Sequence, residues 1–207
     1  MNGISDCFPW LHPKVKKSLT AGIIDSMIKA EHPHLPRWPF TFDTDKAVEA
    51  LLFVASRIPD PTFHSLAKVL YHADKLHLSR FGRPITGDHY IAMKHGPVPS
   101  ATYDILKTIR GDSRLPLPAR AREALDVANN HFVRPRRAAD ERVLSASEKE
   151  CLAVSATAHG AKTFAQRSAE SHGPAWQAAD ENDVIVLENL LLEVDNPEEL
   201  RAHFSQD

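Results

Sequence analysis

Hydrophobic residues recur at helical spacing in the first forty residues of the chain. Val15, Leu19, Ile23 and Met27 lie four positions apart, which predicts one amphipathic helix. The proline-rich segment HPHLPRWPF that follows is expected to be extended, because a residue before proline disfavours the helical backbone. A lone helix cannot bury its own apolar stripe, so this extension should dock on the following domain or on a partner.

Two further apolar stripes predict central helices. The first follows a cap at Asp43 or Thr44 and stops at the breaker Pro59-Asp60-Pro61. The second follows a cap at Thr62 and ends at Gly82. Its buried face is expected to consist of Leu66, Val69, Leu70, Ala73, Leu76 and His77, and its opposite face of Lys68, Tyr71, Lys75 and Ser79.

Short alternating segments predict a small sheet. HYIAMK has large apolar residues at Ile91 and Met93 and is expected to form a strand closed by the turn HGPVP. The segments HFVRP and ERVLS are candidate partner strands, which gives an antiparallel sheet of about three strands.

Caps and glycines predict the remaining helices. Ser145 with Glu148 has the spacing of a capping box. We expect helices from Ser100 to Arg110, from Pro118 to about Asn129, from Ser145 to near Gly160 and from Thr163 to Ser171. A long helix is expected through Val184, Leu187, Leu190 and Leu191, and a last helix after Asn196-Pro197.

These elements predict a mainly α fold of the α+β class. It consists of a single helical domain with a small antiparallel sheet and an N-terminal helical extension. We place the extension at residues 1–42, the domain at 43–195 and an acidic C-terminal helix or tail at 196–207. With 207 residues, 43% of them hydrophobic, the chain is long enough for one sizeable core.

Charge is distributed unevenly, although the formal net charge is only -2. Residues 113–142 carry seven arginines against four carboxylates, whereas residues 170–207 carry ten carboxylates and only Arg201. The acidic segment would repel phosphate and suit a basic protein partner, or it forms solvated helix faces. Together with the N-terminal extension it is a predicted contact region.

Cysteine usage and hydropathy indicate the compartment. Cys7 and Cys151 fit neither a disulfide framework nor a zinc motif. No apolar run approaches the ~20 residues that span a bilayer, and the first residues lack the pattern of a signal peptide. We expect a cytoplasmic protein with no membrane partner.

Asp74 and His77 are the strongest candidates for chemistry. They lie three apart on one helix and can meet, as a general base pair or metal ligands would. The favoured interpretation is a polar pair in the core that fixes the helix against the following turn, because no nucleophile or further ligand is marked. Twelve histidines are scattered without a short-spaced ligand pair, so we expect no metal and no cofactor.

Rigid turns and tryptophans supply candidate contact residues. Gly82, Gly87 and Gly96 flank turns that could display Arg83, Asp88, Lys94 and His95 to a partner, or hold them in internal salt bridges. Trp176 is expected in the core, although an interface remains open. Trp10 and Trp38 are better interface candidates, or they clamp the extension onto the domain.

The stretch LAKVLYHADKLHLSRFGRPITGDHYIAMKHGPVPSATYDILK resembles the signature of the Panacea domain of SocA-like antitoxins. Five pieces occur in order: L-x-x-A-D-x-x-H-L, the G-R-P-I-T-G-D turn, a strand with A-M-K, the G-P-V-P turn and a Y-D-I-L helix. LSASE and SHGPAW are similar to later landmarks of the family, with Ser171 where a threonine is frequent. The resemblance covers about Lys46 to Asp195.

The resemblance implies an antitoxin of a type II toxin-antitoxin system that binds a cognate toxin and is not an enzyme. The founding member also hands its toxin to the ClpXP protease, which implies a ClpXP-type adaptor role only weakly here. The residues that the signature marks as partner-binding candidates are Asp74, Lys75, His77, Arg83, Pro84, Thr86, Asp88, Lys94, His95, Gly96, Pro97 and Trp176.

Two alternatives remain open. The first is a DNA-binding regulator of its own operon that uses Arg134, Arg136 and Arg137, although the net charge and the absence of a clear helix-turn-helix argue against it. The second is a metal-dependent hydrolase that uses Asp74 and His77. No phosphate loop, nucleophile elbow or dinucleotide fingerprint occurs in the sequence.

Overall fold

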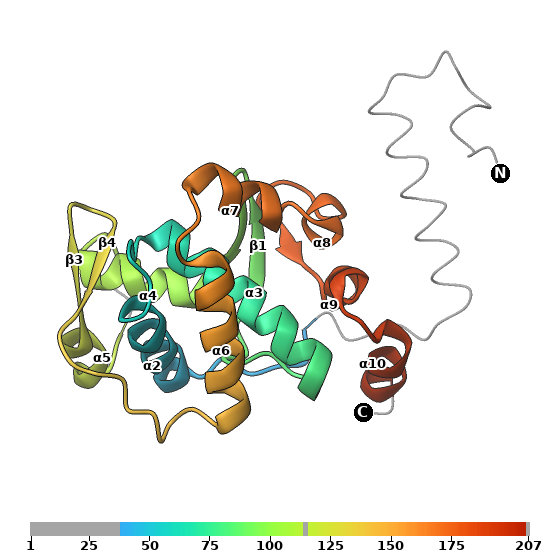
Figure 1. Ribbon diagram of the computed structural model, residues 1–207, viewed down its shortest axis with the longest axis horizontal. Coiled ribbons are helices and arrows are strands. Elements are labelled where there is room, and N and C mark those ends of the chain that lie inside the picture. The colour runs from blue at the N-terminus through green and yellow to red at the C-terminus, as the bar shows by residue number, and fades with distance from the viewer. Residues whose placement is uncertain (1–37, 114–115, 206–207) are drawn as a thin grey trace, which may run out of the picture.

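Helix α3 (Phe63–Phe81) is the central element of the fold, and other helices pack around it (Figure 1). In the computed structural model, which describes residues 38–113 and 116–205, α3 packs against α2 (Thr44–Ala55), α6 (Ala146–His159) and α7 (Phe164–Ser171). Helix α4 (Ser100–Arg110) lies on the α2 side. The mainly α, α+β class predicted from the sequence is confirmed.

Side-chain caps start four of these helices where the sequence predicted them. Asp43 caps α2, and Thr62, Ser145 and Thr163 cap α3, α6 and α7, the last three in capping boxes. Helices α3 and α4 end at Gly82 and Gly111, which are both in the left-handed backbone region that terminates helices. Local sequence therefore specifies these boundaries.

Two hydrophobic cores lie on opposite sides of α3. The first joins α2, α3 and α6 through side chains such as Leu51, Leu66 and Leu152. The second contains Tyr71, Tyr90, Ile185, Leu187, Leu191, Leu200 and Phe204. Helix α3 is therefore covered on both sides. Lys68 and Tyr71, which the helical period places opposite the first apolar face, are buried as well: Tyr71 lies in the second core, and Lys68 lies against β2.

The main sheet has three antiparallel strands in the order β2-β1-β5. Strand β1 (Tyr90–Met93) pairs with β2 (Gly96–Pro99) and with β5 (Val184–Ile185). The number of strands is as predicted, but both predicted partners are wrong. GPVP is a strand rather than a turn, because the chain reverses at residues 94–95.

A separate hairpin contains β3 (Leu125–Ala128) and β4 (Phe132–Pro135). The predicted helix to Asn129 is wrong beyond residue 124: α5 spans only Ala119–Ala124. Asn129 and Asn130, in the loop between the paired residues Ala128 and Phe132, both have positive φ, which asparagine adopts more readily than most residues. The segment ERVLS is no strand, since Ser145 is already the cap of α6.

The C-terminal segment consists of short elements. The long helix predicted through Val184 to Leu191 is wrong: β5 is followed by α9 (Leu187–Leu190), a 3-10 turn (Leu191–Glu193) and α10 (Pro197–Phe204). Helix α8 (Pro174–Gln177) precedes β5. Pairing of Val184 and Ile185 with β1 outweighs the helical spacing of the apolar residues.

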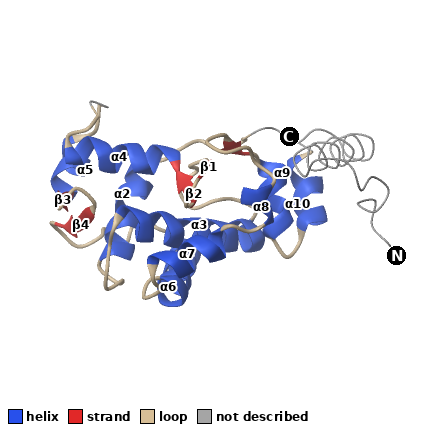
Figure 2. Ribbon diagram, turned by 90° about the horizontal axis from the view of Figure 1, so that it is seen from above, coloured by secondary structure: helices blue, strands red, loops and turns tan. Residues whose placement is uncertain are grey.

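The ends of the domain lie far apart in space. Figures 1 and 2 place the β3–β4 hairpin at one end and α10 at the other. Trp38 and Phe40, predicted to belong to the extension, pack against the second core together with Phe204. The predicted helix of residues 15–27 and Trp10 lie outside the described residues. None of the described helices is long and apolar enough to cross a membrane.

Candidate partner-binding surface

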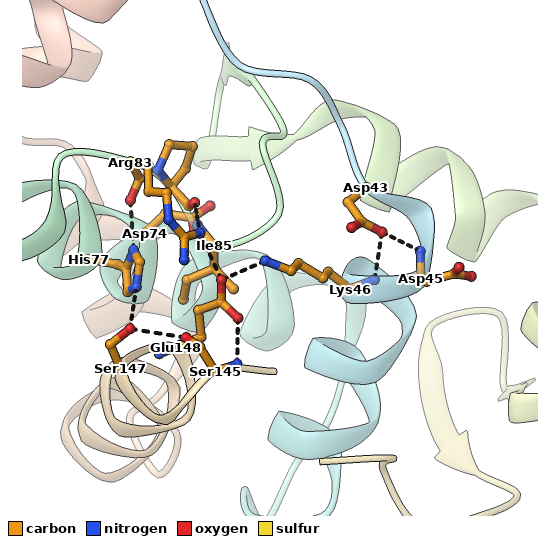
Figure 3. Close-up of polar contacts among 11 residues, drawn as sticks. Asp43, Asp45, Lys46, Asp74, His77, Arg83, Ile85, Ser145, Ser147 and Glu148 are labelled. Carbon is orange, nitrogen blue, oxygen red and sulfur yellow. Dashed lines mark hydrogen bonds and ion pairs between the residues drawn. The ribbon is translucent and has the colours of Figure 1, made fainter. Parts of the chain in front are cut away.

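The turn of residues 82–88, between α3 and β1, is held by buried polar side chains (Figure 3). Asp74 accepts hydrogen bonds from the Ile85 amide at 2.7 Å and the Tyr90 hydroxyl at 2.6 Å. His77 lies between the Arg83 carbonyl at 2.7 Å and the Ser147 hydroxyl at 3.1 Å. The two side chains bind separate groups of the turn and its neighbours, so each of them fixes α3 against the turn.

Burial and hydrogen bonding shift the protonation of both side chains. Burial raises the pKa of Asp74 to about 7, although its two hydrogen bonds oppose the shift. Burial likewise lowers the pKa of His77 below its ordinary value. At neutral pH His77 is therefore mainly uncharged, whereas Asp74 is about half protonated.

Glu148 joins α6 to the same turn. Its fully buried carboxylate accepts hydrogen bonds from Lys46 at 2.7 Å, Arg83 at 2.7 Å and the Ser145 amide at 2.8 Å (Figure 3). Although burial disfavours the charged form, these donors hold the pKa of Glu148 at about 2. The carboxylate stays ionised and ties α2, the turn and α6 together.

The second half of the turn contacts the chain before α2 and the start of α4. Gly87 has φ +72°, and a Cβ there would lie 2.1 Å from the Thr41 carbonyl oxygen, so only glycine fits. The Trp38 indole donates to the Gly87 carbonyl at 3.0 Å. Asp88 caps α4 by accepting from the amides of Ala101 and Thr102, at 3.0 and 2.8 Å. The turn is therefore a rigid base for the β1–β2 hairpin.

The hairpin presents its tip to solvent. Met93, Lys94 and His95 are exposed. Gly96, at φ +97°, packs so closely on α7 that a Cβ would lie 2.2 Å from the Ser171 hydroxyl oxygen. The Trp176 indole donates to the Met93 carbonyl at 2.9 Å, and its ring stacks on His172 with centroids 3.8 Å apart. Trp176 is thus half-buried and supports the hairpin from the side.

Lys68 is the least expected feature of this region. Its side chain is 1% exposed, and its ammonium donates to the Pro97 carbonyl at 2.8 Å. Within residues 38–113 and 116–205 it forms no ion pair. Burial lowers its pKa to about 7. A buried ammonium without a carboxylate is costly, and perturbed groups of this kind concentrate at binding sites.

Lys68 lies at the wall of a hollow that we call the hairpin cleft. Its volume is about 250 Å³, and an adjoining hollow of about 560 Å³ shares Phe63, His64, Tyr103 and Phe164 with it. Phe164 is 49% exposed, and the His64 ring stacks on it at 4.0 Å. The charged residues that line the two hollows are Lys68, Lys94, Arg110, Lys162, Arg167 and a single carboxylate, Asp60. The surface is apolar and basic.

A model of the family described as "Antitoxin SocA-like, Panacea domain" matches residues 66–177. This chain belongs to that family. The match runs from α3 through α8, so it contains the turn, the hairpin, Lys68 and Phe164. Neither the search of curated proteins nor the search of solved structures found a match.

The signature residues of this Panacea domain have two different surroundings. Asp74, His77, Pro84, Thr86 and Asp88 are buried. Arg83 is half-buried on Glu148, and Lys75 forms an ion pair with Glu193. In contrast, Lys94 and His95 are exposed, while Gly96 and Pro97 shape the wall beside Lys68. Lys94 and His95 are thus exposed members of the signature that line the hairpin cleft.

The sequence did not single out Lys68, Met93 or Phe164 as binding residues. Lys68 was placed opposite the apolar face of its helix, and the β2 residues that cover it come from a later segment that one helical period cannot reveal. Phe164 follows its cap Thr163 directly and is the one aromatic residue of α7, so a lone aromatic in an otherwise small and polar helix is the sequence signal for this site.

The arginine cluster proposed for DNA binding lies on and after the β3–β4 hairpin. Arg136 lies 3.6 Å from Asp126, and Arg137 pairs with the buried Glu49 at 2.5 Å. Two of the three arginines therefore already have carboxylate partners within the domain. This pairing reduces the positive charge that the cluster can offer to phosphate.

Proposed function

We propose that this Panacea-domain protein is an antitoxin that binds and neutralises a cognate toxin through the hairpin cleft. The family match over residues 66–177 supports the antitoxin role. The partner is expected to insert an acidic side chain beside an apolar one, because the cleft combines Lys68 and Lys94 with the exposed rings and chains of Phe164 and Met93.

The buried ammonium of Lys68 supports this choice of partner. A toxin carboxylate would supply the counter-charge that Lys68 lacks, and a desolvated pair of this kind contributes strongly to affinity. The interface would extend beyond the cleft, since stable complexes bury about 1,200 Å² or more. The exposed carboxylates of α10 and the N-terminal extension are the further contact regions proposed from the sequence.

The test is to co-express the protein with the product of the adjacent open reading frame, and to score growth rescue and co-purification. Lys94→Glu and Phe164→Ala should weaken co-purification without lowering the melting temperature, because both side chains are exposed. Matched controls are Lys149→Glu and Leu192→Ala, which lie outside the cleft. Equal rescue by all four variants would remove the cleft from the proposal.

The variant Lys68→Met tests the contribution of Lys68 to toxin binding separately from its contribution to folding stability. It keeps the length of the side chain and removes a buried charge, so the free protein should be at least as stable as wild type. Toxin affinity should nevertheless fall by about 2 kcal/mol or more, because the toxin carboxylate would be left unpaired. Retained affinity would show that no acidic group reaches Lys68.

The ClpXP-type adaptor role stays a proposal that rests on resemblance to the founding member. It predicts a shorter toxin half-life when this protein and the protease are both present. Unchanged toxin turnover in a strain without the protease would restrict the function to sequestration.

A further inference from the structure

Three side chains from three helices meet on the face of α3 between α6 and α7. His72 lies in α3, His159 is the last residue of α6, and Glu170 lies in α7. One ligand atom from each lies within 4.8 Å of the other two. The sequence predicted no metal from short spacings, and such spacings cannot detect ligands that tertiary packing brings together.

The existing hydrogen bonds within the described part of the chain leave one possible metal-ligand atom of the cluster without a partner. The His72 Nε2 atom is buried and has no hydrogen-bond partner among the described residues. The His159 Nδ1 atom lies 3.0 Å from one oxygen of Glu170, and Lys162 donates to the other oxygen at 2.6 Å. Lys162 thereby orients the carboxylate, in the manner of an outer-shell partner.

The surroundings of all three groups favour their unprotonated forms, which are the forms that bind metals. Burial lowers the pKa of His72 to about 3, and burial also lowers that of His159. The Lys162 hydrogen bond lowers the pKa of the Glu170 carboxyl. An approach path exists, because His72 and His159 line a hollow of about 240 Å³.

We propose that His72, His159 and Glu170 form a binding site for a divalent transition-metal ion, with zinc as the ion that best fits two imidazoles and one carboxylate. Three protein ligands leave a fourth position for water. The His72 and His159 rings are stacked at 3.9 Å with planes 12° apart. To bind the same ion, His159 turns out of this stack and exchanges its contact with Glu170 for the metal. The ion then links α3, α6 and α7.

The test uses the full chain, purified without a histidine tag and treated with a chelator. Zinc binding is measured by isothermal titration calorimetry, and the retained metal by mass spectrometry after dialysis. We expect one ion per chain, and more than about a tenfold weaker affinity for His72→Gln, His159→Gln and Glu170→Gln. His131→Ala, which changes an exposed histidine outside the cluster, should bind zinc like wild type.

A spectroscopic readout separates this site from zinc bound by cysteine. Cobalt should give visible d–d absorption without a thiolate charge-transfer band, and Glu170→Gln should alter that spectrum. Glu170 is exposed, so this variant stays folded even where a change at His72 does not. Equal zinc and cobalt binding by wild type and the His72→Gln/His159→Gln double variant would overturn the proposal. Toxin binding is measured separately, so failure here leaves the antitoxin proposal intact.

Discussion

Glu148 is the residue on which three separate parts of the domain depend. Its buried carboxylate accepts from Lys46, Arg83 and the Ser145 amide, which belong to α2, the turn and the start of α6. Glu148 therefore does more than complete the capping box of α6, because its buried carboxylate also binds the cations Lys46 and Arg83. Replacement of this one group changes contacts of all three elements.

Glu148→Gln should lower the free energy of unfolding by about 2 kcal/mol, because an amide has one acceptor oxygen and no charge to offer the two cations. Urea unfolding measures the change. Glu150→Gln is the matched control: its side chain is 60% exposed in an ion pair with Arg80, so the loss should stay below about 0.5 kcal/mol.

Low pH should remove the difference in stability between wild type and Glu148→Gln. The pKa of Glu148 in the folded protein is about 2, below its ordinary value, so its contribution is fully present above about pH 4.5 and declines as pH falls toward 2. The stability gap between wild type and Glu148→Gln should therefore shrink between pH 5 and pH 3. A constant gap would mean that the carboxylate charge is not what stabilises the turn.

Gly96→Ala tests the close contact between the hairpin and α7. Both Gly96 and Gly111 have positive φ, so alanine is strained at either position by about 1 kcal/mol. A Cβ at Gly96 also meets Ser171, whereas nothing lies within 4 Å at Gly111. Gly96→Ala should therefore destabilise by about 2 kcal/mol more than Gly111→Ala, as measured by thermal unfolding.

At the scale of elements, capping residues and glycines predicted where helices start and end, but the sequence did not predict which strands pair. Thr62, Ser145 and Gly82 act within one turn of chain, so sequence suffices to place them. Strand β5 contains two residues and forms only because β1 lies beside it. The same limit applies to Lys68 and to the His72, His159 and Glu170 cluster, whose surroundings come from distant segments.

Helix α10 should unfold locally more readily than the helices of the first core. Phe204 contacts Phe40 edge to face at 5.7 Å and completes the smaller core. Phe204→Ala should destabilise by about 3 kcal/mol, and hydrogen exchange should quicken in α9 and α10 before it does in α2 or α6. Leu192→Ala, 48% exposed, should change stability by less than about 0.5 kcal/mol. Uniform acceleration would show that the two cores unfold as one.

At the scale of the molecule, buried histidines set the response to pH. Burial is the main cause that lowers the pKa of His72 to about 3 and of His64 to about 4, and it also lowers the pKa values of His77, His159 and His172. The unfolded chain therefore binds more protons below about pH 6.5. The raised pKa values of Asp74 and Asp88 oppose this effect, because they make the folded chain bind more protons, but only these two of the described carboxyl groups are involved.

Stability should consequently fall from pH 7 to pH 5. With chelator present, unfolding should be accompanied by a net uptake of protons over this range, so the free energy of unfolding should rise with pH. His72→Gln should reduce the slope, and His131→Ala should not. A flat profile over this range would mean that the histidines are not desolvated in solution.

The contact between Phe40 and Phe204 also has a consequence for synthesis on the ribosome. The first core needs nothing beyond α6, so it can assemble while later codons are still being translated. Trp38 and Phe40 are made early, yet their covering residues Leu200 and Phe204 are made some 160 residues later. A nascent chain therefore exposes Trp38 and Phe40 until Phe204 has been made, and a chain that stops before Phe204 keeps these aromatic side chains exposed, which favours aggregation.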